Sequence, residues 1–312
     1  MRLHALTLWK QFPLFWQVER KRILLPQVEV VGFSPWYTLA MRREGFLAYG
    51  ARRVSECVCA LNVRLSVLAA DDLQAVEEAL AAAHRLQTCL TLFASGYPSP
   101  RVALWKRRLR RIVRALNALR DCLRLAEWVG AQQPPLTHKP GVQRALLRLR
   151  QRAETLHQTL LHGWQRWRAD RIPNEIVGLS KRWGQSFGDE AVDPDYALGR
   201  WRLFSREQLG ALESPAPSLA VQCGRVRALL EARELLAPLQ LPLECPDDLQ
   251  ARYETLETQR FRDEAHRLLR ELLQQERERT LQHAGDLRGF GRIRKGWEWL
   301  MEQFENPHPL LE

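Results

Sequence analysis

Apolar residues along most of the chain recur at steps of three and four, the period of a helix with one buried face. The clearest example lies within 101–129, where the apolar positions are Trp105, Leu109, Ile112, Leu116, Leu119, Leu123 and Ala126. The same periodicity predicts helices over about 38–68, 72–94, 101–129, 142–169, 195–213, 217–237, 247–283 and 288–304. The chain is therefore predicted to be all-α.

The segments between these helices carry the usual helix-ending residues. ASGYPSP at 94–100 and AQQPPLTHKPG at 131–141 contain proline and glycine. Residues 172–198 hold several Gly and Pro residues and are expected to be irregular in part. The strand-like stretch Val28–Val31 is too short to carry a sheet.

The two ends of the helical region resemble each other. Residues 75–93 and 109–129 form one pair of amphipathic segments, and 219–239 and 249–272 form a similar pair. Each pair ends in a long helix containing Arg-Asp, at Arg120 and at Arg262. We expect two similar helical-bundle halves related by a pseudo-twofold axis, with Arg262 over Arg120.

This pattern predicts one main domain with two flanking segments. The main domain is expected over 38–304, with halves at about 38–170 and 195–304. Residues 1–37 are expected to form an aromatic-rich N-terminal extension, and 305–312 a C-terminal tail.

Positive charge is concentrated in one stretch of the chain. The whole sequence has 47 Lys and Arg against 36 Asp and Glu. Residues 101–152 alone hold 14 Lys and Arg, 12 of them Arg, against two acids, which gives +12 there and leaves −1 for the rest. A concentrated positive field attracts polyanions, and guanidinium groups grip phosphate with a planar fork. An Arg-rich solvated surface is the alternative explanation.

Four of these arginines share one helix face. Arg107, Arg110, Arg111 and Arg114 lie opposite the apolar stripe, where like charges repel unless an anion neutralises them. Arg120 lies nearer the apolar boundary, where it is either a half-buried structural ion pair or a ligand contact.

Two segments resemble the CHAD family, the conserved-histidine α-helical domain. Residues 76–93 have the length of the family's first motif helix, end in LTLF and place His84 and Arg85 at its Arg-Arg pair. The following helix resembles the second motif, with Arg114, Arg120 and Asp121 in register. The resemblance covers about 40–304. Glu77 stands where the family has its name-giving histidine, and Leu80 where the next motif arginine stands.

The resemblance implies a helical bundle with a basic central groove or channel that binds inorganic polyphosphate. The candidate polyphosphate-binding residues are His84, Arg85, Lys106, Arg107, Arg110, Arg111, Arg114, Arg120, Arg225, Arg227 and Arg262. His84 shares a helix face with Glu77 and either contacts the anion or is a satisfied histidine at the core edge. Arg225 and Arg227 either form the opposite wall of the channel or are solvated on the surface.

No pattern typical of an enzyme or a metal site is present. The six cysteines form no CxxC pair and are expected to be mostly small apolar residues on helices. No phosphate-binding glycine loop, nucleophile elbow or HExxH occurs. Asp193 and Asp195 are expected to cap a helix rather than to bind metal. We expect a non-enzymatic protein without cofactor or metal.

The sequence also predicts where such a protein acts and with what. No apolar run reaches 18 residues and no signal-peptide core is present, which favours a cytoplasmic protein without a membrane partner, associated with polyphosphate granules if the resemblance holds. Inorganic polyphosphate or another polyanion is the expected partner. Two alternatives remain: nucleic acid bound at 101–152, and a protein-interaction scaffold of degenerate CHAD fold. Trp164 and Trp167, beside Arg166 and Arg168, resemble a surface on which bases stack, but their three-residue spacing on an amphipathic helix is more typical of core residues. Nothing in the sequence indicates the oligomeric state.

Overall fold

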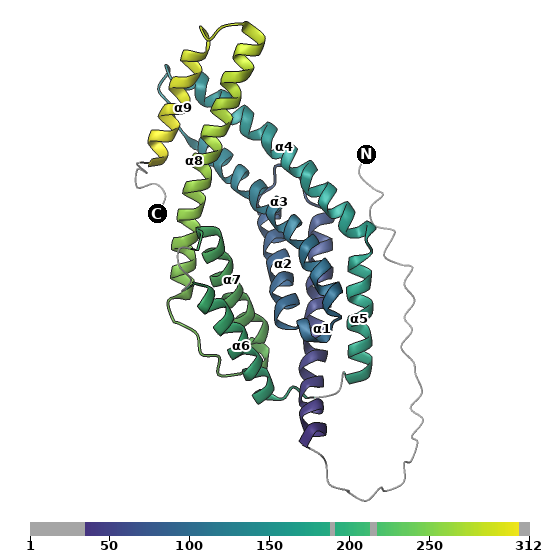
Figure 1. The fold of residues 1–312 in the computed structure, drawn as a ribbon. Helices are drawn as coiled ribbons and strands as arrows, with labels where there is room; N and C mark the ends of the chain where they lie inside the picture. The colour runs from purple at the N-terminus through teal and green to yellow at the C-terminus, as the bar shows by residue number, and fades with distance from the viewer. Residues whose placement is uncertain (1–34, 188–190, 213–216, 306–312) are drawn as a thin grey trace, which may run out of the picture. The chain divides into compact units, whose positions relative to one another are not determined.

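The computed structural model describes residues 35–187, 191–212 and 217–305 (Figure 1). Within these ranges the chain forms α-helices with two short 3₁₀ turns, at Ala94–Gly96 and Ala237–Leu239, and no strand. The helices are α1 (Pro35–Ser66), α2 (Leu73–Leu92), α3 (Ser99–Ala131), α4 (Lys139–Ala169), α5 (Ile172–Phe187), α6 (Pro194–Leu212), α7 (Leu219–Leu236), α8 (Leu249–Ala284) and α9 (Phe290–Glu305). The prediction of an all-α fold is confirmed. The strand-like stretch 28–31, almost all of the predicted extension and the tail beyond 305 lie outside the described residues.

The chain divides into two units, residues 1–38 and residues 39–312, and everything below concerns the second unit. The domain limits and the pseudo-twofold relation between halves remain predictions.

The segment 172–198, expected to be irregular in part, is helical over most of its described residues, and residues 191–193 are non-helical. Residues 172–187 form helix α5. Ile172 and Ile176, one turn apart, are both fully buried, and this local anchoring outweighs the two glycines in the segment. The indole Nε1 of Trp183 donates to the carbonyl of Gly96 at 2.6 Å, which ties α5 to the turn after α2. The break lies earlier, at Arg171, whose φ of 54° is in the left-handed region.

The helix starts agree better with the sequence. Asp72 caps α2 by accepting a hydrogen bond from the backbone N–H of Ala75 at 2.9 Å. Asp193 accepts from the backbone N–H groups of Asp195 and Tyr196 at the start of α6. The expectation that the Asp193–Asp195 pair belongs to a helix cap is therefore confirmed for Asp193.

Helix α2 packs between α3 and α7, and α3 packs against both α4 and α8. Figure 1 shows α8 running from α7 past α3 to α9. The buried face of α3 is the predicted apolar stripe, with Trp105, Leu109 and Leu116 fully buried. The four-arginine face of α3 is consequently exposed, at Arg107, Arg110, Arg111 and Arg114.

Two glycines allow α4 and α9 to pack backbone against backbone. A Cβ at Gly141 would lie 2.2 Å from the carbonyl oxygen of Ile293, and one at Gly296 would lie 2.3 Å from the carbonyl oxygen of His138. Any side chain at either position would push the helices apart.

None of the helices in the described part of the chain combines the length and the apolar character needed to cross a bilayer.

Candidate anion-binding groove

A cavity of about 490 Å³ lies among helices α2, α3, α6 and α7 and is called the central cavity below. His84, Arg110, Arg225 and Arg227 line it together with polar side chains that include Gln87, Thr88, Thr91, Asn117 and Gln208. No Asp or Glu is among the described residues that line it. Three guanidinium groups without a lining carboxylate give this cavity a positively charged wall, which is chemically suited to an anion.

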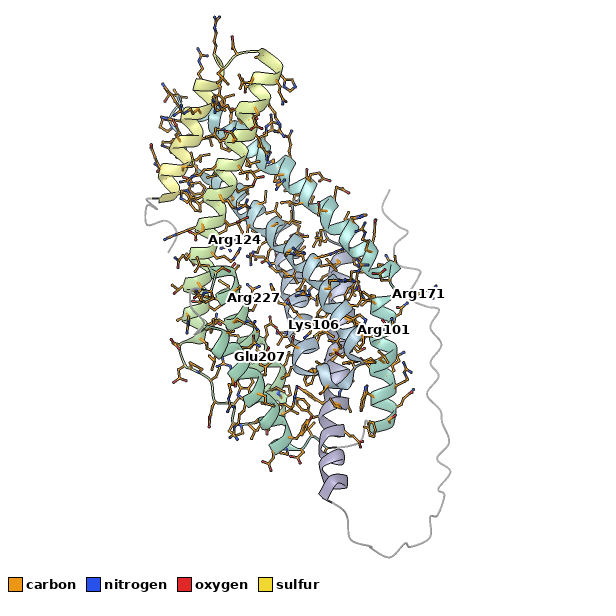
Figure 2. All side chains as sticks on the ribbon, in the orientation of Figure 1. Arg101, Lys106, Arg124, Arg171, Glu207 and Arg227 are labelled. Carbon is orange, nitrogen blue, oxygen red and sulfur yellow. The ribbon has the colours of Figure 1, made fainter. Side chains whose placement is uncertain are left out.

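A buried side chain holds one of these cations, Arg225, in place. The Nη1 of Arg225 donates to the side-chain oxygen of Gln208 at 2.8 Å, and Gln208 is only 2% exposed. Lys106 lies on α3 one turn before Arg110, and Figure 2 shows it on the side of α3 that faces Glu207 of α6. Burial lowers the pKa of Lys106, and Glu207 raises it in opposition while Arg110 lowers it further.

His84 enters the central cavity with an unsatisfied nitrogen. Its Nε2 is buried and finds no hydrogen-bond partner within the described part of the chain. Burial lowers the pKa of His84 well below its usual value, and the charges of Arg227, Arg120 and Arg260 lower it further. The imidazole is therefore neutral at pH 7. The alternative of a satisfied histidine at the core edge does not describe this nitrogen.

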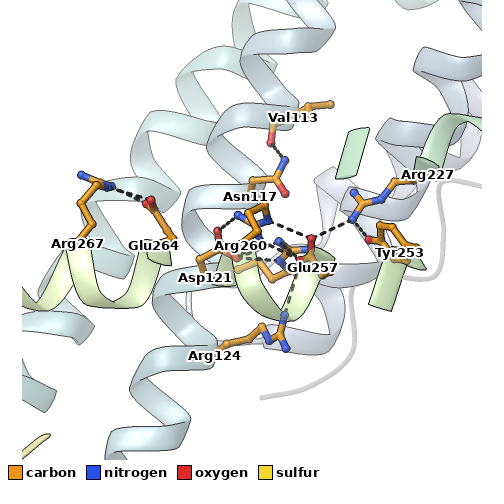
Figure 3. A network of polar contacts seen from close by, with 11 residues as sticks. Val113, Asn117, Asp121, Arg124, Arg227, Tyr253, Glu257, Arg260, Glu264 and Arg267 are labelled. Carbon is orange, nitrogen blue, oxygen red and sulfur yellow. Dashed lines mark hydrogen bonds and ion pairs between the residues drawn. The ribbon is translucent and has the colours of Figure 1, made fainter. Parts of the chain in front are cut away.

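A buried ion network joins α3, α7 and α8 (Figure 3). Arg120, only 5% exposed, donates through Nη2 to Asp121 at 2.9 Å and lies 2.7 Å from Glu257 of α8. Arg260 donates two hydrogen bonds of 2.8 Å to the carboxylate of Asp121 and two, of 2.9 and 3.0 Å, to Glu257. Of the two possibilities that the sequence left open for Arg120, the geometry shows the buried ion pair.

Arginine outnumbers carboxylate in this network. Arg227 lies 3.8 Å from Glu257 and donates to the hydroxyl of Tyr253. Arg124 also lies 3.8 Å from Glu257, and its guanidinium covers the ring of Phe261. Four arginines (120, 124, 227 and 260) thus surround two carboxylates (121 and 257), which leaves two positive charges in excess.

The excess positive charge lowers the pKa values of the two carboxylates. Burial alone raises the pKa of Asp121 and of Glu257. Hydrogen bonds from Arg260 and the charges of the surrounding arginines outweigh burial, so both pKa values are lowered. Both groups are ionised at neutral pH, and Arg227 remains only partly neutralised at the cavity wall.

A second cavity, of about 290 Å³, shares His84 and Arg227 with the first but is lined by acids. Glu77, Glu231 and Glu234 all contribute to its wall. Arg85 forms ion pairs with Glu231, at 3.3 Å, and with Glu234. Glu231 and Glu234 therefore neutralise Arg85, and the three carboxylates of the second cavity disfavour an anion there.

The structure therefore separates the residues that the sequence grouped as one site. Four of them line the central cavity: His84, Arg110, Arg225 and Arg227. Arg111 and Arg114 line a different cavity, toward α4, while Arg107 and Arg262 are exposed on α3 and α8. Whether any of these residues binds polyphosphate remains a prediction.

The sequence analysis did not single out the partners that position these cations. Asp121 of the second motif helix pairs with Arg260, two residues before the Arg262 that the repeat suggested. A signal was present in Glu257 and Arg260, which are spaced i, i+3 on one helix face and do pair at 2.9 Å. No sequence pattern indicated that Gln208 would accept a hydrogen bond from Arg225.

Comparison with known proteins agrees with the motifs. Residues 52–200 match the family model described as CHAD domain, so the resemblance is confirmed over these residues. Neither a curated protein nor a solved structure matches the chain. The matched segment contains α2, α3 and α4 and ends within α6, so α7 and α8 lie beyond it.

Proposed function

We propose that this protein binds inorganic polyphosphate without transforming it, and that the central cavity is the binding site. The observation that carries the proposal is the composition of the cavity wall: Arg110, Arg225 and Arg227 converge from two helices, and no carboxylate is among the described lining residues. A linear phosphate chain carries about one negative charge per unit and matches a row of guanidinium forks.

The ion network explains why the cavity keeps its charge. Asp121 and Glu257 are engaged by buried arginines, so they fix the positions of Arg120 and Arg260 without neutralising Arg227 completely. His84 contributes a buried ring nitrogen that a phosphate oxygen would satisfy once the ring carries a proton there.

Two observations favour polyphosphate over nucleic acid. The aromatic side chain in the cavity wall is Phe204, which is buried, so the described lining offers no exposed ring on which a base stacks. Trp167, the second of the two candidate stacking residues, is fully buried, and Arg168 covers the ring of Trp164 at 5.2 Å. A scaffold that binds an acidic protein remains the second alternative, because the same cavity attracts carboxylates. A cytoplasmic location and an association with polyphosphate granules belong to this proposal.

The test is a competition titration with three polyanions at about physiological salt. Long-chain polyphosphate, single-stranded DNA of equal charge and poly-glutamate are titrated against the full chain. We expect polyphosphate to bind most tightly, with an affinity that falls linearly on a logarithmic salt scale because bound phosphates release counterions. Tighter binding of DNA would favour nucleic acid as the ligand, and binding of poly-glutamate alone would favour the scaffold.

A further inference from the structure

A second group of arginines on helix α3 lies on the side that faces α4. A cavity of about 390 Å³ there is lined by Arg108, Arg111 and Arg114 of α3 and by Thr159, His162, Gly163 and Arg166 of α4. It is called the outer cavity below. It shares no lining residue with the central cavity.

The cations of the outer cavity are not compensated. Asp170 pairs with Arg108 at 2.7 Å. Arg111, Arg114 and Arg166 are exposed, and within the described residues none of these three has an ion-pair partner. Four arginines against one carboxylate leave three positive charges in excess around a small cavity.

The lining residues of the outer cavity come from one face of α3 and one face of α4. Arg108, Arg111 and Arg114 are three residues apart on α3, and Thr159, His162 and Arg166 recur at i, i+3 and i+7 on α4. Gly163 of α4 also lines the cavity, and a Cβ placed there would approach no closer than 4.0 Å to Ile112. Guanidinium, imidazole and hydroxyl groups thus border one opening from both helices.

We infer that the outer cavity is a second phosphate-binding site, which takes a short stretch of inorganic phosphate chain independently of the central cavity. The lining has guanidinium donors for phosphate oxygens and no aromatic side chain for a base. Because the two cavities lie on different sides of α3, one molecule then holds phosphate chains at two places and joins separate chains.

The decisive experiment uses tripolyphosphate as the probe and isothermal titration calorimetry of the full chain at about physiological salt. To isolate the outer cavity, the titration is run on the variant Arg110→Glu/Arg225→Glu, which disables the central cavity. We expect this variant to keep one site per chain. Adding Arg111→Gln and Arg166→Gln should weaken that remaining site at least tenfold.

The matched control adds Arg150→Gln and Arg277→Gln instead, which removes the same charge at exposed positions of α4 and α8. This control should leave the remaining site within about twofold. Circular dichroism of each variant checks that the helices are retained.

The outcomes separate this inference from the proposed function. If wild type has a single site that Arg110→Glu/Arg225→Glu abolishes, the outer cavity is overturned and the central one stands. If the only site is lost with Arg111→Gln/Arg166→Gln, the central cavity is overturned instead. Equal weakening by the control pair would mean that net charge alone attracts the probe, which also overturns the outer site.

Discussion

At the scale of single residues, the position of Arg120 is the most informative. It lies on the helix whose exposed face carries the arginine stripe, yet its own guanidinium is buried with Asp121, Glu257 and Arg260 nearby. Such a group acts on a ligand only through the side chains it positions. Burial lowers the pKa of His84, and the charges of Arg227, Arg120 and Arg260 lower it further, while Glu257 lies 3.8 Å from Arg227 at the cavity wall.

Removing the charge of Glu257 should affect stability more than removing that of Asp121. Glu257 lies within 4 Å of four arginines, whereas ion pairs join Asp121 to two of them. We expect Glu257→Gln to lower the free energy of unfolding by roughly 3 kcal/mol, the typical effect of leaving buried charges without their partner. Urea unfolding measures this change. Glu254→Gln, at an exposed position one turn earlier on α8, is the control and should change stability by less than about 0.5 kcal/mol. Equal effects of the two substitutions would show that the network is not buried as described.

His84 predicts a pH dependence of binding. Because its pKa is well below the usual value in the free protein, the ring is neutral at pH 7, and an anion bound beside it raises that pKa. Lowering the pH toward 5 should therefore tighten polyphosphate binding by wild type, by up to about tenfold for each pH unit between the pKa of the bound form and that of the free form. His84→Gln should remove this added gain, and long chains should be used so that terminal phosphates contribute little.

The same residue has the opposite effect on the unliganded fold. Between the unfolded pKa of about 6.5 and the lower folded pKa, the unfolded chain binds the proton and the folded chain does not. Stability in this window therefore falls as the pH falls, and His84→Gln should show less of this loss in urea unfolding at pH 7 and pH 5. A wild-type protein that binds polyphosphate equally at both pH values would contradict the placement of His84 beside the ligand.

At the scale of helices, the sequence predicted most elements, and packing decided the rest. The apolar periodicity of 101–129 predicted both the buried stripe of α3 and its exposed arginines correctly. The same pattern placed Arg110 and Arg111 on one stripe. They line different cavities because α7 packs toward one side of the stripe and α4 toward the other. A local pattern contains no information about which neighbour covers which side.

The α4–α9 crossing gives a prediction at this scale. We expect Gly141→Ala to lower the free energy of unfolding by about 1–3 kcal/mol, because the new Cβ would overlap the backbone of α9. Gly199→Ala in α6 is the matched control, since nothing lies within 4 Å of the Cβ there. The control should be neutral or stabilising by up to about 1 kcal/mol, as expected for alanine in a helix. Thermal unfolding of the two variants distinguishes these outcomes, and a stable Gly141→Ala protein would rule out the close crossing.

At the scale of the whole molecule, the CHAD motifs were the part of the site that the sequence could predict. The family match covers 52–200, and of the four predicted site residues that line the central cavity it contains two, His84 and Arg110. The opposite wall comes from α7, and the supporting carboxylate–arginine pair joins Asp121 to Arg260, 139 residues later. Contacts of that sequence separation depend on tertiary packing, which the motif spacing did not specify.

The most direct test of the central cavity is the affinity of long-chain polyphosphate for Arg110→Glu/Arg225→Glu compared with Arg150→Glu/Arg277→Glu. Both variants carry the same change in net charge, but only the first alters the cavity wall. Each lost charged contact is worth about 1.5–3 kcal/mol, so the cavity variant should bind at least about 100-fold more weakly at physiological salt, while the control stays within a few-fold of wild type. Equal affinities of the two variants would contradict the assignment of the central cavity as the polyphosphate site.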